Sequence, residues 1–118
     1  MSTTILQPNV ETNEVKGKVV YEGGEKKTSP GLGAAFILPD QAGFIDSWLL
    51  SLVMQTPGAS GLIQYTISDR AAVLSDRAYW YNWDAGTVNE NTNDVLYPVV
   101  AVRQRNISGT TKIEVRAV

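Results

Sequence analysis

Residues 99–118 read VVAVRQRNISGTTKIEVRAV, and apolar and polar side chains alternate through both halves of this stretch. Val100 and Val102 share one face of the first half, and Ile113 and Val115 share one face of the second. A repeat of two residues is the spacing of a β-strand, and Ser108-Gly109 supplies turn residues between the halves. The stretch therefore predicts a terminal hairpin made of strands 99–106 and 110–118.

Shorter runs of the same kind precede it, separated by residues that favour turns. These runs predict strands at 34–38, 44–55, 62–67, 78–83 and 95–97. Between them, residues 69–77 read as a surface loop or one helical turn, and residues 89–94 as a loop. About six to eight short strands indicate an all-β fold, a single jelly-roll-like β-sandwich with an immunoglobulin-like sandwich as the alternative.

The first thirty residues differ in composition, because Thr, Glu, Asn, Lys and Gly dominate and apolar residues are sparse. We therefore divide the chain into an extended N-terminal arm, residues 1–30, and a β-sandwich domain, residues 31–118. Residues 16–21 are a strand candidate within the arm. Composition leaves open a free tail or an arm ordered by neighbouring subunits. On this interpretation, removing the arm leaves the sandwich folded.

The 118 residues contain neither histidine nor cysteine. A Ser-His-Asp or Cys-His nucleophile, histidine-ligated zinc and thiolate chemistry are therefore all excluded. We expect a protein that is not an enzyme and that uses no cofactor.

The charge balance also limits the partners, because 10 Lys and Arg stand against 12 Asp and Glu, with a pI near 5.0. A chain with this balance and no basic stripe is a poor match for phosphate backbones, so we expect no nucleic-acid partner. The longest apolar stretch, residues 48–54, is too short to span a bilayer, so we expect no membrane association. No secretory signal is recognised at the amino end, which indicates synthesis in the cytoplasm.

Carboxylates are the remaining candidates for chemistry. Asp69, Asp76 and Asp84 flank the aromatic segment, and a carboxylate pair at the correct separation can hydrolyse a glycosidic bond. Each lies in a turn context, where Asp forms local hydrogen bonds, and this structural role is favoured. Asp84, Glu90 and Asp94 are loop carboxylates of the kind that bind calcium, but the regular spacing of a calcium loop is missing. We therefore expect no metal site.

The aromatic residues near the middle of the chain are the principal binding candidates. On a strand, Trp80 faces one side, and Tyr79, Tyr81 and Trp83 face the other. At most one of the two tryptophans then lies in the core, and the other is available to a subunit contact or, less favoured, to a sugar ring. The interface candidates are Tyr79, Trp80, Tyr81, Trp83, Val19 and Tyr21.

Two short motifs carry little weight. Asn106-Ile107-Ser108 matches a glycosylation acceptor, but such matches arise by chance and no secretory signal accompanies this one. Gly31 and Gly33 are too close together to form a phosphate loop.

A wider pattern runs through residues 38–118. Its elements are Leu38-Pro39-Asp40 with Gly43-Phe44, the strand at 61–69, the YWYNWDAGTV segment at 79–88, PVVAVR at 98–103, and the final strand at 112–118. In this pattern the chain resembles the small all-β virion proteins of tailed bacteriophages, of the head-decoration or cement type. The resemblance implies a structural protein on the virion surface that binds the major capsid protein, with a homotrimer as its oligomeric state. The arm has no counterpart in it.

The leading hypothesis is therefore a decoration protein on the outer surface of a bacteriophage capsid. One alternative is a carbohydrate-binding β-sandwich module on a fibre or a secreted enzyme, using Trp80 or Trp83. Another is a small coat subunit that encloses a genome, which the shortage of basic residues opposes.

Overall fold

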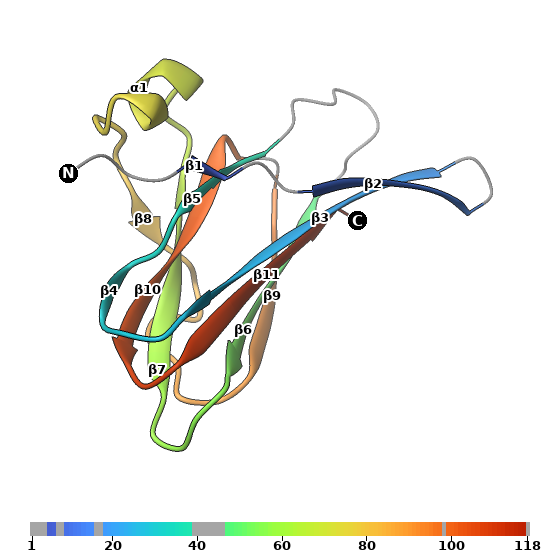
Figure 1. The fold of residues 1–118 in the computed structure, drawn as a ribbon. Helices are drawn as coiled ribbons and strands as arrows, with labels where there is room; N and C mark the ends of the chain where they lie inside the picture. Colours follow the sequence, from blue (N-terminus) through green and yellow to red (C-terminus); the bar gives the residue numbers. More distant parts are fainter. Residues whose placement is uncertain (1–4, 7–8, 16–17, 39–46, 98, 118) are drawn as a thin grey trace.

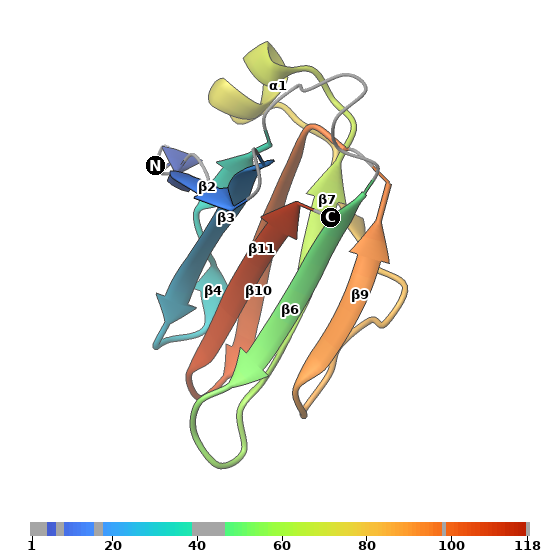
Figure 2. The same cartoon turned by 90° about the vertical axis from the view of Figure 1, so that its right-hand side faces the viewer.

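The chain folds into two β-sheets packed face to face (Figures 1 and 2). The computed structural model describes the backbone of residues 5–6, 9–15, 18–38, 47–97 and 99–117, and the side chains of residues 24–38, 47–97 and 99–116. Among the described residues, no helix has the length and hydropathy needed to cross a bilayer.

Sheet A has the order β1-β5-β10-β7-β8, with β4 also paired to β10. Its strands are β1 (Ile5–Leu6), β4 (Gly31–Leu32), β5 (Ala35–Ile37), β7 (Ser60–Thr66), β8 (Tyr81–Asn82) and β10 (Ala101–Ser108). Sheet B has the order β2-β3-β11-β6-β9. Its strands are β2 (Asn9–Val15), β3 (Lys18–Lys27), β6 (Trp48–Met54), β9 (Thr92–Leu96) and β11 (Thr111–Ala117).

The strand order is that of a jelly roll. Setting β1, β2 and β4 aside leaves eight described strands, which are numbered here 1 to 8 along the chain. Sheet B then has the order 1-8-3-6, and sheet A has the order 2-7-4-5. Successive strands thus cross repeatedly between two antiparallel sheets, as in jelly-roll domains. The predicted jelly-roll-like sandwich is confirmed, and the immunoglobulin-like alternative is not the order adopted.

The predicted terminal hairpin is wrong. β10 pairs with β4, β5 and β7 in sheet A, whereas β11 pairs with β3 and β6 in sheet B. The turn between them, where Gly109 has a φ of 65°, carries the chain from one sheet to the other. The alternating faces of both strands therefore meet across the core, which buries more apolar surface than one flat hairpin does.

Several boundaries also differ from expectation. Only Tyr81–Asn82 of the predicted strand 78–83 is paired, and the predicted loop 89–94 contributes its last three residues to β9. The helical turn expected within 69–77 is α1 (Arg70–Leu74), and the Asp69 carboxylate accepts a hydrogen bond from Ala72 N (2.8 Å) at its start. β6 covers the end of the predicted strand 44–55, and residues 44–46 lie outside the described residues.

Between the sheets lies the main core, which contains the largest buried side chains, among them Trp48 and Trp83. A smaller apolar cluster lies on the outer face of sheet A, where Val73 of α1 packs against Ala35, Ile37 and Ala101. The connection from β7 to β8 therefore covers part of that face, and residues 101–104 of β10 are buried on both sides.

The predicted arm contains strands that take part in both sheets. β1 pairs with β5 in parallel, β2 pairs with β3, and residues 22–27 of β3 pair with β11. Figure 1 shows β2 and the beginning of β3 extending beyond the sandwich. Residues 22–27 thus lie inside sheet B, although sequence composition groups them with the arm.

Candidate functional site

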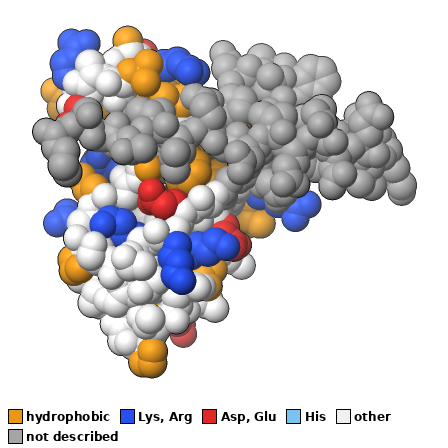
Figure 3. Space-filling model, in the orientation of Figure 1, with side chains coloured by type: hydrophobic (Ala, Val, Ile, Leu, Met, Phe, Trp, Pro, Cys, Tyr) orange, Lys and Arg blue, Asp and Glu red, His pale blue; other side chains and the backbone are white. Residues whose placement is uncertain are grey.

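Four large apolar side chains stand exposed around the α1 end of the sandwich. Ile67 follows β7, Leu74 ends α1, Tyr79 follows the helix and Tyr97 follows β9, with exposed fractions of 67%, 56%, 79% and 86%. Figures 1 and 2 place α1 and the ends of β7 and β9 at this same end. We call these four residues the apical surface, and Figure 3 shows hydrophobic side chains at this end bordered by Lys and Arg.

Local hydrogen bonds explain why this end is held in place. Tyr79 N donates to Ser68 Oγ (3.0 Å), which fixes the segment after α1 against the end of β7. Arg77 N donates to Ala72 O (2.8 Å) and closes the helix at its carboxyl end. Asp76 takes a φ of 57° in the tight turn between these bonds. The apical surface therefore belongs to an ordered framework.

Trp80 does not stand free, because it covers a buried arginine. The Arg103 guanidinium carbon lies 4.0 Å from the centroid of the Trp80 ring, and Arg103 Nε donates to Gln64 Oε1 (2.9 Å). Gln64 Nε2 donates in turn to Asn82 Oδ1 (3.0 Å). Burial lowers the pKa of Arg103, and the nearby Asp76 carboxylate acts in the opposite direction. The cluster anchors the segment after α1 to the outer face of sheet A.

Trp83 lies in the core and is unavailable to a partner in the folded chain. Its side chain is 2% exposed, its Nε1 donates to Gly86 O (2.6 Å), and its backbone N donates to Ile63 O (2.8 Å). The inference that at most one tryptophan enters the core agrees with this placement. Val19 and Tyr21 have their backbone in β3, and their side chains lie outside the described ones.

Tyr81 forms a second exposed aromatic feature at the edge of sheet A. Its ring stacks on Tyr65, with centroids 5.8 Å apart and an interplanar angle of 28°, and Tyr81 remains 52% exposed. The two residues are register partners on β8 and β7. Tyr81 and Tyr79 are thus accessible interface candidates, whereas Trp80 is half-buried.

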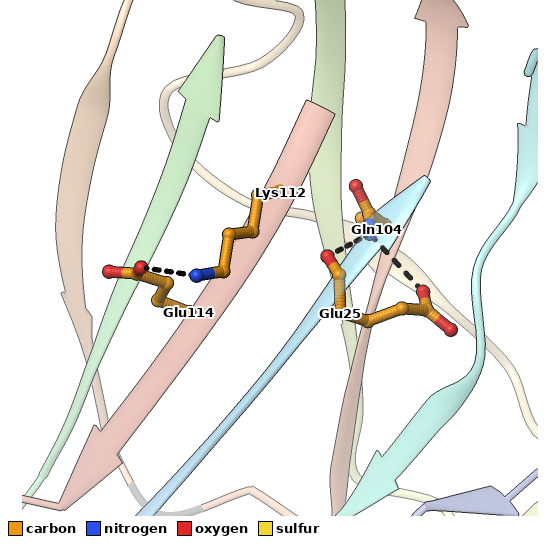
Figure 4. A network of polar contacts seen from close by, with 4 residues as sticks. All are labelled: Glu25, Gln104, Lys112 and Glu114. Atoms are coloured by element: carbon orange, nitrogen blue, oxygen red, sulfur yellow. Dashed lines mark hydrogen bonds and ion pairs between the residues drawn. The ribbon is translucent and has the colours of Figure 1, made fainter. Parts of the chain in front are cut away.

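A buried polar network joins the two sheets, and sequence reasoning did not identify it. Gln104 Nε2 donates to the backbone oxygen (2.8 Å) and to Oε1 (3.2 Å) of Glu25, as Figure 4 shows. Gln104 Oε1 accepts from Thr111 Oγ1 (2.8 Å). The Glu25 carboxylate also accepts from Ala34 N. These bonds fix how β10 sits over β3 and β11.

Asn106 belongs to the same network, and the buried position of its side chain bears on the glycosylation motif. It is 1% exposed, and its Nδ2 lies within hydrogen-bond distance of Lys27 O, Gly109 O and Thr111 Oγ1. The amide is therefore inaccessible to a glycosyltransferase in the folded chain.

The carboxylates considered for catalysis or calcium do not gather. Within the described part of the chain, no three Asp and Glu residues lie close enough to hold a metal ion, and all five candidates fall in that part. Asp69 caps α1, and Asp94 accepts from Val95 N. The calcium hypothesis is therefore wrong for Asp84, Glu90 and Asp94, and the contacts observed for Asp69 and Asp94 are local ones.

The ion pair between Lys112 and Glu114 lies on the solvent side of β11. Its atoms are 3.2 Å apart, and Figure 4 shows both side chains projecting from one strand. An exposed pair of this kind contributes at most about 1 kcal/mol to stability. It does not mark a site.

Comparisons with models of protein families, with curated proteins and with solved structures each found no match. The apical surface and the exposed ring of Tyr81 are therefore the two candidate binding features of the described residues.

Proposed function

We propose that the chain is a structural virion protein of the decoration or cement type, which binds the outer surface of a bacteriophage capsid through its apical surface. Its partner in this proposal is the major capsid protein, and its location is the virion surface. The observation that carries the proposal is the exposure of Ile67, Leu74, Tyr79 and Tyr97 at one end of a hydrogen-bonded framework.

Exposure of this kind has a physical cost, which contact with a partner removes. Large apolar side chains grouped on a soluble protein mark an interaction surface more often than isolated ones do. Tyrosine in particular is enriched where protein interfaces derive most of their binding energy. Jelly rolls occur in capsid and lectin domains, but a fold alone assigns no function. The apical surface is therefore the main support.

The proposal includes a homotrimer. Tyr81 is 52% exposed at the edge of sheet A, outside the apical surface, and a closed symmetric assembly covers such a side chain without leaving a surface for open-ended growth. Light scattering on the purified protein at micromolar concentration tests this point. A monomeric mass would contradict it.

Co-sedimentation with undecorated particles of the phage that encodes the chain tests the capsid contact. Ile67→Ser removes an apical side chain, and Ile107→Ser removes an isoleucine that is 43% exposed near the β10 end, where the chain turns toward β11. We expect Ile67→Ser to weaken binding by about tenfold, and Ile107→Ser to bind like the native chain. Equal binding by both variants and the native chain would contradict the apical assignment.

The stacked tyrosines favour a second candidate function, a carbohydrate-binding module. The exposed ring of Tyr81 stacks on Tyr65 at the edge of sheet A, and an exposed aromatic face is suited to a sugar ring. The version based on Trp83 is not available, because that side chain is buried. A glycan array with the native chain and Tyr81→Ala tests this candidate, which predicts binding that the substitution abolishes.

A further inference from the structure

β9 is one of the two edge strands of sheet B, with β2 at the other edge. Among the described strands it pairs with β6 alone, and Figure 2 shows it at the edge of the sheet. An edge strand presents unpaired N–H and C=O groups to which another strand can bind. Val95 and Tyr97 are 55% and 86% exposed along this edge. Natural edges are commonly protected by lysine, but residues 92–96 read TNDVL.

Two hydrogen bonds at the end of β6 establish which amides face which neighbour. Gln55 N donates to Thr110 O (2.9 Å) toward β11, and Met54 N donates to Asn91 Oδ1 (2.8 Å) on the side of β9. Successive amides of a strand point in opposite directions. The even-numbered amides of β6 therefore point toward β9.

The register carries this alternation into β9. Leu50 is opposite Asp94, so these two residues form a hydrogen-bonded pair and the Asp94 N–H points toward β6. The N–H groups of Asn93, Val95 and Tyr97 then point toward the free edge.

The middle one of these three donors is already occupied. Asp94 Oδ1 accepts a hydrogen bond from Val95 N at 2.8 Å. A carboxylate acceptor makes this bond stronger than a neutral pair. A strand that approaches the edge must first displace Asp94 from the Val95 N–H.

We propose that the free edge of β9 is a pairing surface for a second copy of this chain, and that Asp94 closes it in the isolated protein. The antiparallel register centred on Val95 places Val95 opposite its own copy and Asn93 opposite Tyr97. Asp94 then faces Leu96 and not a second carboxylate, so charge does not oppose this register. The two central hydrogen bonds of the pairing are those that the Val95 N–H groups donate.

Sedimentation equilibrium of three variants tests the role of Asp94. Asp94→Ala removes the acceptor, Asp94→Asn keeps an Oδ1 acceptor without the charge, and Asp84→Ala makes the same charge change at an exposed turn. Two caps are lost per dimer, at about tenfold each, so we expect Asp94→Ala to associate about a hundredfold more tightly. Asp84→Ala should remain like the native chain, and Asp94→Asn should associate more weakly than Asp94→Ala, because its amide oxygen still accepts from the Val95 N–H. Association of Asp94→Asn as strong as that of Asp94→Ala would overturn the capping role.

Disulfide trapping tests the register, because the chain has no cysteine of its own. With Asp94→Ala, Val95→Cys should oxidise to a covalent dimer, since the two thiols lie at the centre of the pairing. Asn89→Cys in the same background is an exposed control and should form no covalent dimer. Equal rates for the two cysteine positions would overturn the register. Sedimentation and disulfide trapping do not depend on the proposed capsid function. Stronger binding of Asp94→Ala to capsids, without self-association, would show a different occupant of the edge and would overturn the second copy.

Discussion

Removing residues 1–30 deletes β1, β2 and β3 together, whereas removing residues 1–17 leaves β3 in place. If residues 1–30 are a dispensable arm, both truncations fold. The pairing of residues 22–27 with β11 predicts a different result. Without β3, β11 loses its partner on one side and becomes an edge strand.

The contacts of β3 give the magnitude. Its six register pairs with β11 correspond to roughly six backbone hydrogen bonds, each worth about 1 kcal/mol. Gln104 also loses its acceptors on Glu25, and a buried donor left without a partner costs about 1–3 kcal/mol. The total of about 7–9 kcal/mol is comparable to the whole stability of a domain, about 5–15 kcal/mol.

Thermal melts of the two truncations and the full chain, followed by circular dichroism, test this expectation. The chain lacking residues 1–17 should melt cooperatively at a reduced Tm, because it loses β2 and only the two-residue β1. The chain lacking residues 1–30 should show no cooperative transition at 25 °C and above. A cooperative melt of the chain lacking residues 1–30 within a few degrees of the full chain would refute the reasoning and support residue 30 as the boundary.

Four further outcomes are expected. Trp83→Ala removes the buried indole and its bond to Gly86. The free energy of unfolding measured in urea should fall by about 3–5 kcal/mol, against about 1–2 kcal/mol for Trp80→Ala. Equal losses would contradict the placement of Trp83 in the core. Arg103→Lys keeps the charge but loses the Nε donor to Gln64 and the flat stacking surface, so denaturation should show a loss of about 1–2 kcal/mol. Burial lowers the pKa of Arg103 in the folded chain. Burying the charged guanidinium therefore destabilises the fold by a constant amount at neutral pH, and this cost is relieved only as the pH rises through the lowered pKa. The difference in Tm between the native chain and Arg103→Met should therefore stay constant from about pH 6 to about pH 9, and a steep change in that window would contradict this assignment. Thermal melts with calcium and with a chelator should coincide, because the described carboxylates form no cluster; a shift of many degrees would show a site.

Residue alternation was sufficient to predict the fold class but not the neighbours of each strand. It indicates that Val102 and Val115 point inward, and both do. It does not distinguish a hairpin from a turn that crosses between sheets, because the periodicity within each strand is the same in both. The pairing of β10 with β7 rather than with β11 depends on residues distant in sequence.

Polar residues at the inward-facing positions of β10 indicate a buried polar network, which the sequence analysis did not predict. Gln104 and Asn106 fall on the same face of β10 as Val102, and this phase identifies them as buried groups in need of partners. The acceptors of Gln104 Nε2 on Glu25 and one acceptor of Asn106, Lys27 O, belong to β3, which the sequence alone groups with an arm. The apical surface was missed for a different reason. Ile67 and Tyr97 lie just beyond strand ends, where periodicity no longer indicates exposure.

A cryo-electron microscopy map of the parent phage particle is the most direct test of the proposed function. The account predicts jelly-roll density on the outer capsid surface, in groups of three, with Ile67, Tyr79 and Tyr97 facing the major capsid protein. Outer-surface density with these side chains turned to solvent would contradict the apical assignment. A capsid without this density, or with the jelly roll forming the shell itself, would contradict the decoration function.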